Sequence, residues 1–432
     1  MKKLLAILIG VAASCALAQT ASAAGLKPVH AFCAKTDCAD GAQPWAPPVT
    51  DGKGNYYGVT AQGGAKGKGT IYRMTLANGH WSFTRLYSFC TDKNCTDGAE
   101  PRGTLVVDTD GNLYGTAELG GDIGNGTIFK FQPSGAGGTF KRLYSFCAKA
   151  NCADSAIAQD LSLVYQGQSS GLPYDGTSPF YGETSGGGAT NHGVVFAFTP
   201  NAAQTKWTFK TLYSFCPKAN CLDGAVPYTT VAIDGAGNLF GTTAAGGKYN
   251  FGTVYKLAPD GAGWTHTVLH HFCAQKTSTC PDGTSPIAAP VLDGAGNLYG
   301  TTFNGGSTTF GTVYKLVPNG DAYKLTTLHT FCNDTTGGVC ADGSNPWSGP
   351  IFDGQGRLFG TTYFGGDTGQ GTLYRLAGPS LKSFARMVSF DGTTASGAAP
   401  LAGLMLDASG AFYGSTVIGA PNNAGVFYKF TP

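Results

Sequence analysis

The chain has 432 residues and a formal net charge of +2 at pH 7, and only 12% of its residues are charged. No basic segment stands out, so the sequence excludes nucleic acid and anionic membrane surfaces as expected partners. The 66 glycines, together with many Tyr, Phe, Val and Thr residues, indicate short strands joined by tight turns.

The N-terminal stretch MKKLLAILIGVAASCALAQTASAAG is typical of a secretory signal peptide. Lys2 and Lys3 precede an apolar run, and small residues follow it. We expect cleavage after Ala23, so that 1–23 is the signal peptide and 24–432 is the mature protein, organised as a single domain. Loss of the two lysines brings the formal net charge to 0.

The sequence disfavours both a lipid anchor and a membrane span. A lipoprotein attached through Cys15 would need Leu at the position where Ala12 stands. No second apolar run approaches the roughly 20 residues that a membrane helix needs. We therefore expect a soluble monomer that is secreted or periplasmic.

A phenylalanine that recurs at nearly regular spacing marks a tandem repeat through the whole mature chain. Its seven copies are Phe32, Phe89, Phe146, Phe215, Phe272, Phe331 and Phe390. Neighbouring copies are 57 or 59 residues apart, except for one interval of 69, where repeat 3 carries an insertion.

Each repeat contains four short apolar segments separated by Gly, Asp and Asn turns. In one repeat these segments are Thr104–Asp108, Leu113–Thr116, Gly126–Phe131 and Thr139–Phe146. Four short strands without a helical period predict one blade of a β-propeller.

The two ends of the array predict how the propeller closes. Leu26–Phe32 reads as a fourth strand with no blade before it, and Gly425–Pro432 reads as a third strand with no fourth strand after it. If these two segments pair, the chain forms an all-β, seven-bladed propeller whose N-terminal strand completes the last blade. Such closure also covers the edge strands that an open array would expose.

The twelve cysteines of the mature chain fall into six close pairs at the ends of the outer strands. The pairs are Cys33 with Cys38, Cys90 with Cys95, Cys147 with Cys152, Cys216 with Cys221, Cys273 with Cys280, and Cys332 with Cys340. An even number of cysteines in an exported chain favours disulfides, and the seventh outer strand lacks both cysteines together, as expected if the two members of a pair bond each other. Zinc would need two pairs at one ion, which separate blades cannot supply, so we expect no metal and no cofactor.

The pattern GNLYGTxxxGGxxxxGTVYKL, read from Gly111, Gly237 and Gly296, resembles the GloVer tandem repeat family of bacterial secreted and surface proteins. The resemblance covers nearly all of the mature chain and implies a repeat-built fold and export. Its motifs are structural, so it implies no particular activity. Members of that family carry varied C-terminal anchors, whereas this chain stops at Pro432 without a sorting tail, which favours a freely secreted or periplasmic protein.

Two sets of aspartates recur in the repeats. Those of the first hairpin are interpreted as turn residues rather than calcium ligands, because most copies have one carboxylate and no downstream Glu; they are Asp51, Asp108, Asp234, Asp293, Asp353 and Asp407. Those that follow the cysteine loops are expected to shape the loops, with a series of shallow ligand sites as the alternative; they are Asp40, Asp97, Asp154, Asp223, Asp282, Asp342 and Asp391.

Acidic residues that break the repeat gather in blades 2 and 3. Glu183 stands where other blades have Thr, and Asp160 aligns with Gly103 of blade 2. Loop topology predicts that these residues approach one sector of one face, together with the remaining members Glu100, Arg102, Glu118 and His192. The candidate catalytic residues are Glu118, Asp160, Glu183 and His192, because paired carboxylates can cleave a glycosidic bond. The alternative is a solvated patch paired with Arg102.

Aromatic residues on the same face are candidates for ligand binding. The candidate binding set is Trp45, Arg102, Glu118, Glu183, Phe303, Trp347, Tyr363 and Phe364. Exposed aromatic side chains commonly anchor ligands, although the same loops could simply pack against their neighbours.

The sequence contains no HExxH motif or Walker loop. We therefore favour a non-catalytic platform that binds carbohydrate or an extracellular or envelope protein. A polysaccharide hydrolase or lyase that uses the blade 2–3 carboxylates is the alternative, and a purely structural surface protein is the third interpretation.

If the six cysteine pairs are disulfides, the mature protein has no free thiol. Mass spectrometry after alkylation should find no alkylated cysteine in the unreduced protein and twelve after reduction. Several alkylated cysteines before reduction would contradict the pairing.

Overall fold

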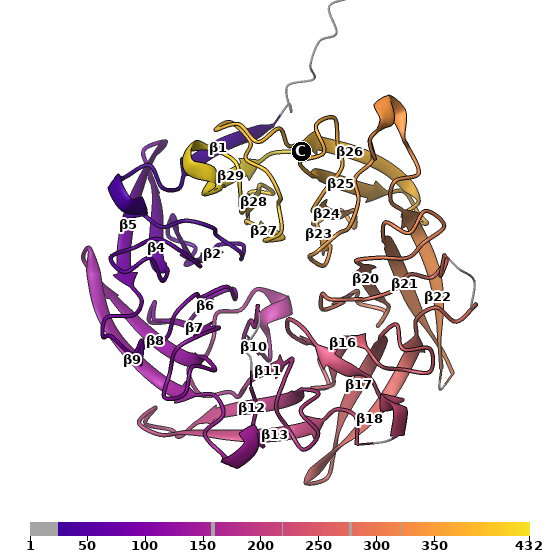
Figure 1. Cartoon of the computed structure of the whole chain (residues 1–432), viewed down its shortest axis with the longest axis horizontal. Helices are drawn as coiled ribbons and strands as arrows, with labels where there is room; N and C mark the ends of the chain where they lie inside the picture. The colour runs from indigo at the N-terminus through magenta and orange to yellow at the C-terminus, as the bar shows by residue number, and fades with distance from the viewer. Residues whose placement is uncertain (1–24, 157–159, 218, 276–278, 321) are drawn as a thin grey trace, which may run out of the picture.

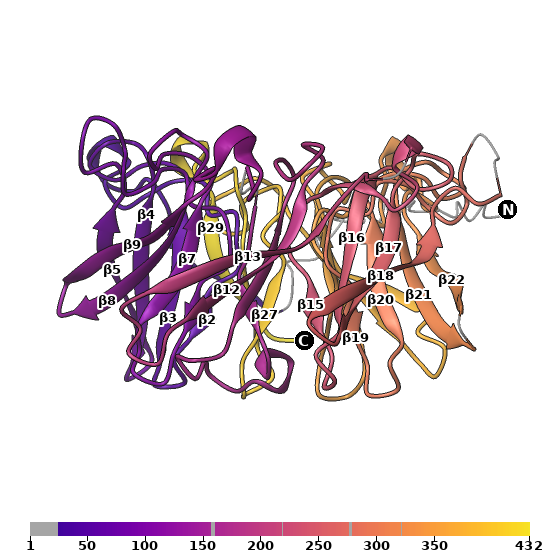
Figure 2. The same cartoon turned by 90° about the horizontal axis from the view of Figure 1, so that it is seen from below.

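The computed structural model describes residues 25–156, 160–217, 219–275, 279–320 and 322–432. Within them the chain forms seven antiparallel sheets around a central axis, which confirms the predicted seven-bladed β-propeller (Figure 1). Figure 2 shows the propeller from the side, with loops on the two faces between which the strands run. The predicted signal peptide, 1–23, lies outside the described residues. No helix within the described ranges is long and apolar enough to cross a membrane.

The strands of each blade follow one another from the axis to the rim, with the last strand outermost. Blade 1 contains β2 (Val49–Thr50), β3 (Asn55–Thr60), β4 (Thr70–Ala77) and β5 (His80–Ser88). Blade 2 contains β6 (Val106–Val107), β7 (Leu113–Ala117), β8 (Thr127–Ser134) and β9 (Gly137–Ser145). Blade 3 contains β10 (Val164–Tyr165), β11 (Phe180–Thr184), β12 (Val194–Pro200) and β13 (Trp207–Ser214).

Blade 4 contains β15 (Ala232–Ile233), β16 (Leu239–Ala245), β17 (Thr253–Asp260) and β18 (Gly263–His271), and a short extra strand, β14 (Ala225–Pro227), also pairs with β16. Blade 5 contains β19 (Val291–Leu292), β20 (Leu298–Thr302), β21 (Thr312–Asn319) and β22 (Ala322–Thr330). Blade 6 contains β23 (Ile351–Phe352), β24 (Leu358–Thr362), β25 (Thr372–Ala377) and β26 (Ser383–Ser389). Short 3₁₀ turns occur at Thr36–Cys38, Ala150–Cys152, Gln168–Ser170, Ala219–Cys221, Thr336–Gly338 and Pro421–Asn423.

Blade 7 is assembled from both ends of the described chain. Its sheet has the order β1-β29-β28-β27, built from β1 (Leu26–Ala31), β29 (Val426–Phe430), β28 (Phe412–Ser415) and β27 (Leu404–Leu406). Figure 1 shows β1, in indigo, beside β29, in yellow. Leu26 pairs with Phe430 and Ala31 with Val426 in antiparallel register. The N-terminal strand therefore closes the propeller, as the sequence predicts.

A glycine in the second strand of every blade makes room for an aromatic ring of the third strand. In blade 5, Gly300 faces Tyr314 across the ladder, and a Cβ on Gly300 would lie 2.3 Å from the Tyr314 hydroxyl oxygen. The seven cross-strand pairs are Gly58–Tyr72, Gly115–Phe129, Gly182–Phe196, Gly241–Tyr255, Gly300–Tyr314, Gly360–Tyr374 and Gly414–Tyr428. All seven rings are fully buried, and Tyr314 packs with residues of both blade 4 and blade 5.

The six predicted cysteine pairs are all disulfide-bonded, which confirms the pairing expected from the sequence. Each disulfide closes the loop that follows an outer strand and joins cysteines 5 to 8 residues apart. Cys33 is bonded to Cys38, Cys90 to Cys95, Cys147 to Cys152, Cys216 to Cys221, Cys273 to Cys280, and Cys332 to Cys340.

A buried aspartate holds each of these disulfide loops to the outer strand. Asp97 accepts hydrogen bonds from the Tyr87 hydroxyl at 2.6 Å and from the Thr91 amide at 3.2 Å. In other blades a histidine replaces this tyrosine: the His329 Nε2 atom lies 2.9 Å from a carboxylate oxygen of Asp342. These contacts favour the loop-shaping interpretation over a series of ligand sites.

The aspartates of the first hairpins are turn residues, as the sequence indicates. In blade 5, Asp293 Oδ1 accepts the amides of Ala295 and Asn297 at 2.9 and 3.0 Å, and Oδ2 accepts the Asn297 side-chain amide at 2.7 Å. The carboxylate thus replaces backbone partners inside the turn.

Gly300→Ala should destabilise the protein, because the new methyl group would meet the Tyr314 hydroxyl. Overpacking of this kind costs about 1–3 kcal/mol. The Tyr314 hydroxyl has no hydrogen-bond partner within the described residues, so adding Tyr314→Phe should restore part of the loss. Urea unfolding of the single and double variants measures both effects.

Gly294→Ala is the matched control, because Gly294 has open space around its Cβ position. We expect it to change the free energy of unfolding by less than about 0.5 kcal/mol. Equal effects of Gly294→Ala and Gly300→Ala would contradict the packing argument.

Candidate functional site

One residue of each inner strand pairs with an aromatic residue of the second strand, and the residue four positions before it lies at the inner end of the blade. The strand registers that define this position are Val49↔Tyr57, Val106↔Tyr114, Val164↔Tyr181, Ala232↔Phe240, Val291↔Tyr299, Ile351↔Phe359 and Met405↔Tyr413. The corresponding residues, hereafter the axial residues, are Trp45, Arg102, Asp160, Tyr228, Ile287, Trp347 and Leu401.

An unusual backbone turn places most of the axial residues. Two positions before the axial residue, six blades have a non-glycine residue with φ between 53° and 57°, followed by proline. The amide of this residue donates to a carbonyl of the preceding blade, for example Asn345 to Phe310 at 2.7 Å and Val226 to His192 at 3.0 Å. Strained φ values persist where surrounding contacts hold the backbone, and here those contacts direct the axial side chain, two residues later, towards the axis.

Five of the seven axial residues line a pocket of about 200 Å³. Residues of all seven blades line it, so the pocket lies on the propeller axis. Trp45, Arg102, Asp160, Trp347 and Leu401 all contribute to its wall. We call this cavity the axial pocket.

The structure corrects the alignment of Asp160. By strand register, Asp160 corresponds to Arg102 of blade 2, and Leu161 corresponds to Gly103. The hydrogen bonds agree: the Thr116 hydroxyl donates to the Leu161 carbonyl at 2.5 Å, as Thr301 donates to the corresponding Ser348 carbonyl at 3.1 Å. The loop after Asp154 is one residue longer than in blade 2, and this brings Asp160 into the axial pocket.

Arg102 is the centre of a charged cluster at this pocket. Its guanidinium lies 3.2 Å from Glu100 and 3.0 Å from Glu118, and it stands over the Trp45 ring at 4.7 Å. Lys68 Nζ lies 3.5 Å from the other oxygen of Glu100. The predicted gathering of Glu100, Arg102 and Glu118 is therefore present, with Arg102 paired to both carboxylates.

Asp160 lies in the same cluster without a cation of its own. Burial raises the pKa of Asp160 to about 7, although the nearby Arg102 and a hydrogen bond from Trp347 act in the opposite direction. Its Oδ1 atom is shielded from solvent and accepts no hydrogen bond within the described residues. Burial also raises the pKa of Glu118, against the effect of Arg102. The cluster thus holds two carboxyl groups whose pKa values burial raises, and of the two only Asp160 lines the pocket.

Aromatic side chains from several blades meet at Trp347. Its ring centroid lies 5.5 Å from Phe303, 5.8 Å from Tyr228, 6.4 Å from Trp45 and 6.5 Å from Tyr363. Phe364 stacks on Tyr363 at 3.9 Å and is 46% exposed. The predicted loop aromatics therefore form one continuous cluster beside the axial pocket.

Sequence reasoning missed Tyr228, which joins Trp347 to the charged cluster. Burial and, to a smaller extent, the negative charges of Asp160 and Glu118 raise the pKa of the Tyr228 hydroxyl to about 12. A signal was present in the sequence: five of the axial residues besides Tyr228 directly follow the proline of their blade. A comparison of the residue after this proline in every blade would have identified Tyr228.

Glu183 does not join the cluster, contrary to the sequence prediction. Its side chain is only 1% exposed and lies between blades 3 and 4, where the Tyr255 hydroxyl donates to it at 2.6 Å. Burial raises the pKa of Glu183 to about 8, despite the hydrogen bond from Tyr255. A dissolved ligand cannot contact such a residue, so Glu183 is better interpreted as part of the contact between blades.

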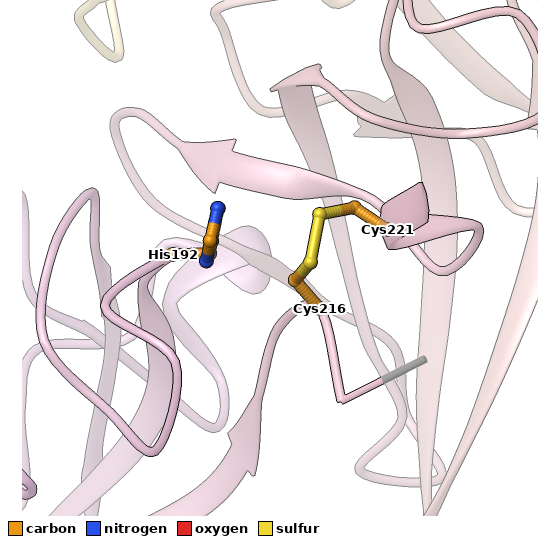
Figure 3. A group of neighbouring side chains, drawn as sticks. All are labelled: His192, Cys216 and Cys221. Carbon is orange, nitrogen blue, oxygen red and sulfur yellow. A yellow bond between two sulfur atoms is a disulfide. The ribbon is translucent and has the colours of Figure 1, made fainter. Parts of the chain in front are cut away.

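His192 also lies away from the lining of the axial pocket, at a disulfide loop. Figure 3 shows it beside the Cys216–Cys221 disulfide, and its Nδ1 atom lies 2.6 Å from the Thr190 carbonyl. Among the described residues, His192, Cys216 and Cys221 are the one group whose potential ligand atoms lie close enough together to hold a metal ion. Because both sulfurs are bonded to each other, they are not thiolates, which are the form of cysteine that binds metals.

A model of the family described as the Gloeobacter/Verrucomicrobia repeat matches residues 16–178, 164–339 and 273–432. No curated protein matches the chain in sequence. A putative 6-phosphogluconolactonase from Bacteroides uniformis is similar in structure, with 12% identity and a TM-score of 0.48 over 79% of this chain and 83% of that one. An α-L-arabinanase from Penicillium chrysogenum complexed with arabinobiose is also similar in structure, with 12% identity and a TM-score of 0.46 over 76% of this chain and 91% of that one. A PL25 ulvan lyase is similar with 11% identity and a TM-score of 0.44 over 81% of this chain and 85% of that one. These similarities carry no argument about activity or ligand.

Glu183→Gln should flatten the pH dependence of stability. The pKa of Glu183 is about 8 in the folded protein and near 4.5 when unperturbed. At a pH between these two values, the carboxyl group therefore binds a proton when the protein folds. The stabilising contribution of the protonated group is therefore full below about pH 4.5 and is lost as the pH rises towards 8. Each pKa unit corresponds to about 1.4 kcal/mol, so the loss amounts to a few kcal/mol.

Urea unfolding between pH 5 and pH 9 tests this expectation. Glu183→Gln keeps an acceptor for Tyr255 but cannot ionise, so its stability should fall less with pH than that of the wild type. Asp110→Asn, at an exposed turn, is the control and should keep the wild-type slope. A Glu183→Gln variant with the wild-type slope would contradict the assignment.

Proposed function

The chain belongs to the Gloeobacter/Verrucomicrobia repeat family, and because that repeat accounts for what the blades share, we propose that its function resides in what they do not share, the axial pocket, which binds one sugar unit of a glycan. The observation that carries this proposal is the composition of the axial residues. Besides an isoleucine and a leucine, this position of the repeat is occupied by two tryptophans, an arginine and an aspartate, which line one cavity, and by a tyrosine, which packs against Trp347.

The chemistry of the pocket suits a pyranose ring. Such a ring has an apolar C–H face and an edge of hydroxyl groups. The faces of Trp45 and Trp347 offer apolar area, while Arg102 can donate to hydroxyl oxygens and Asp160 can accept from hydroxyl groups. Because the Asp160 carboxylate lines the pocket, a ligand hydroxyl can donate to it without displacing an existing ion pair.

The size of the pocket favours one sugar unit over a longer segment. Its volume of about 200 Å³ is below the roughly 300–1,000 Å³ of pockets for drug-sized ligands. The cluster of Phe303, Tyr363 and Phe364 extends outward from Trp347, so a second unit of the same glycan can lie against it.

An exported protein would meet such glycans outside the cytoplasm. The six disulfides favour an oxidising compartment, in agreement with 1–23 acting as a signal peptide. We therefore place the protein in the periplasm or outside the cell, as a monomeric binding protein of residues 24–432.

Glycan cleavage at the same pocket is the second candidate. A carboxyl group with a pKa near 7, as in Asp160, is suited to donate a proton at neutral pH. Binding is favoured over cleavage because Glu118, the nearest second carboxylate, is paired with Arg102, and because Glu183 lies outside the pocket. Release of shorter oligosaccharides by the wild type, lost in Asp160→Asn while binding remains, would establish cleavage instead.

Trp347→Ala should weaken glycan binding at least tenfold, which corresponds to about 1.4 kcal/mol. Calorimetry with soluble neutral, N-acetylated, amino and uronic oligosaccharides measures the affinity, and thermal unfolding checks that the variant is folded. A ligand at 100 times its Kd should add about 2.7 kcal/mol to the stability of the wild type.

Trp264→Ala is the matched control, because Trp264 lies in the outer strand β18 against Tyr181. It removes the same side chain elsewhere and should leave the affinity unchanged. If no oligosaccharide of the panel binds, or if both variants lose affinity equally, the axial pocket is not a glycan site.

A further inference from the structure

The charges at the axial pocket do not balance. Three carboxylates (Glu100, Glu118 and Asp160) face two cations, Arg102 and Lys68. Lys68 and Arg102 both contact Glu100, and Arg102 also contacts Glu118. Asp160 is the carboxylate that remains without a direct ion pair, and Arg102 is the one cation among the residues that line the pocket.

The aromatic wall offers a complementary feature. Arg102 covers the face of Trp45 at 4.7 Å, whereas no such cation contact occurs at Trp347 among the described residues. Trp347 instead lies between Tyr228, Phe303 and Tyr363, and it also donates a hydrogen bond to Asp160. Tryptophan faces attract cations, most strongly where the cation is removed from water.

We infer that the sugar unit bound in the axial pocket carries a protonated amine, so that the ligand is an amino sugar of the hexosamine type, with its ammonium group directed at the side of the Asp160 carboxylate that lines the pocket beside Trp347. This inference rests on the proposed function and names its ligand class. The ammonium group supplies the missing positive charge and donates a charge-assisted hydrogen bond to the carboxylate. An N-acetylated sugar supplies neither charge nor ammonium donors, and a uronic acid adds a negative charge next to Asp160 and Glu118.

Proton exchange gives the inference a second signature. The titratable and charged groups around Asp160 are Arg102, Glu118 and Tyr228, with Glu100 behind Arg102. Because the pKa of Asp160 is about 7, part of the protein is protonated there at neutral pH, and an ammonium ligand must displace that proton. Affinity for the amine should therefore be highest near about pH 7, because Asp160 binds a proton at lower pH and the amine of a glucosamine unit loses its own proton as the pH rises further.

The test compares three sets of matched oligosaccharides: β-1,4-linked glucosamine oligomers, the same oligomers fully N-acetylated, and glucose oligomers of equal length. Calorimetry on the mature protein should show the glucosamine oligomers binding at least tenfold more tightly than either of the others. Asp160→Asn, which keeps the shape but not the charge, should abolish that preference and its pH dependence. Asp122→Asn, which removes an exposed carboxylate paired with Arg142, should retain both.

The outcomes separate this inference from the proposed function. If the neutral or N-acetylated oligomers bind as tightly as the glucosamine oligomers, or if Asp160→Asn keeps the preference, the site binds glycans but the amine assignment is wrong. If trilysine competes as well as a glucosamine oligomer, the pocket recognises an ammonium group without a sugar and the inference is overturned. If no oligomer binds at all, both the inference and the proposed function fail.

Discussion

The close approach of a glycine and an aromatic ring within every blade is the constraint on which the rest of this propeller depends. Any larger residue at Gly300 or its six equivalents would meet the ring of the third strand and push the two strands apart. With the glycine present, the ring fills the space between neighbouring blades, and seven equal contacts place seven blades around one axis. Since this core is the same everywhere, the inner ends of the blades are free to differ.

That division explains which features could be predicted from the sequence. The blade count and the closure by Leu26–Ala31 follow from local patterns repeated seven times, and each repetition supports the others. Arg102 and Glu118 were identified among residues that break the repeat, and Trp45 and Trp347 as aromatics of the same face. In the structure Trp45, Trp347 and Arg102 line one pocket, and Glu118 pairs with Arg102. Departures from a repeat can therefore be found in a single sequence, whereas their distances from one another cannot.

The failures have equally specific causes. Asp160 was assigned to the wrong position because loop length was counted from Asp154, and one additional residue moves a side chain from the strand to the pocket wall. Glu183 was placed with the other carboxylates because loop topology predicts that the acidic residues of blades 2 and 3 approach one sector of one face. In the structure it occupies a threonine position between blades and meets Tyr255, a partner from a different repeat that no local pattern indicates.

The six disulfides have a consequence for how this chain acquires its structure. Each joins cysteines only 5 to 8 residues apart, so every native partner is the nearest cysteine along the chain. Correct oxidation therefore needs no prior tertiary structure and can proceed segment by segment along the chain. Closure of blade 7 is the opposite case, since β1 is synthesised early and must wait for β29. Folding thus separates into early covalent steps that are local and one late assembly step that is not, and only the late step requires the chain through β29.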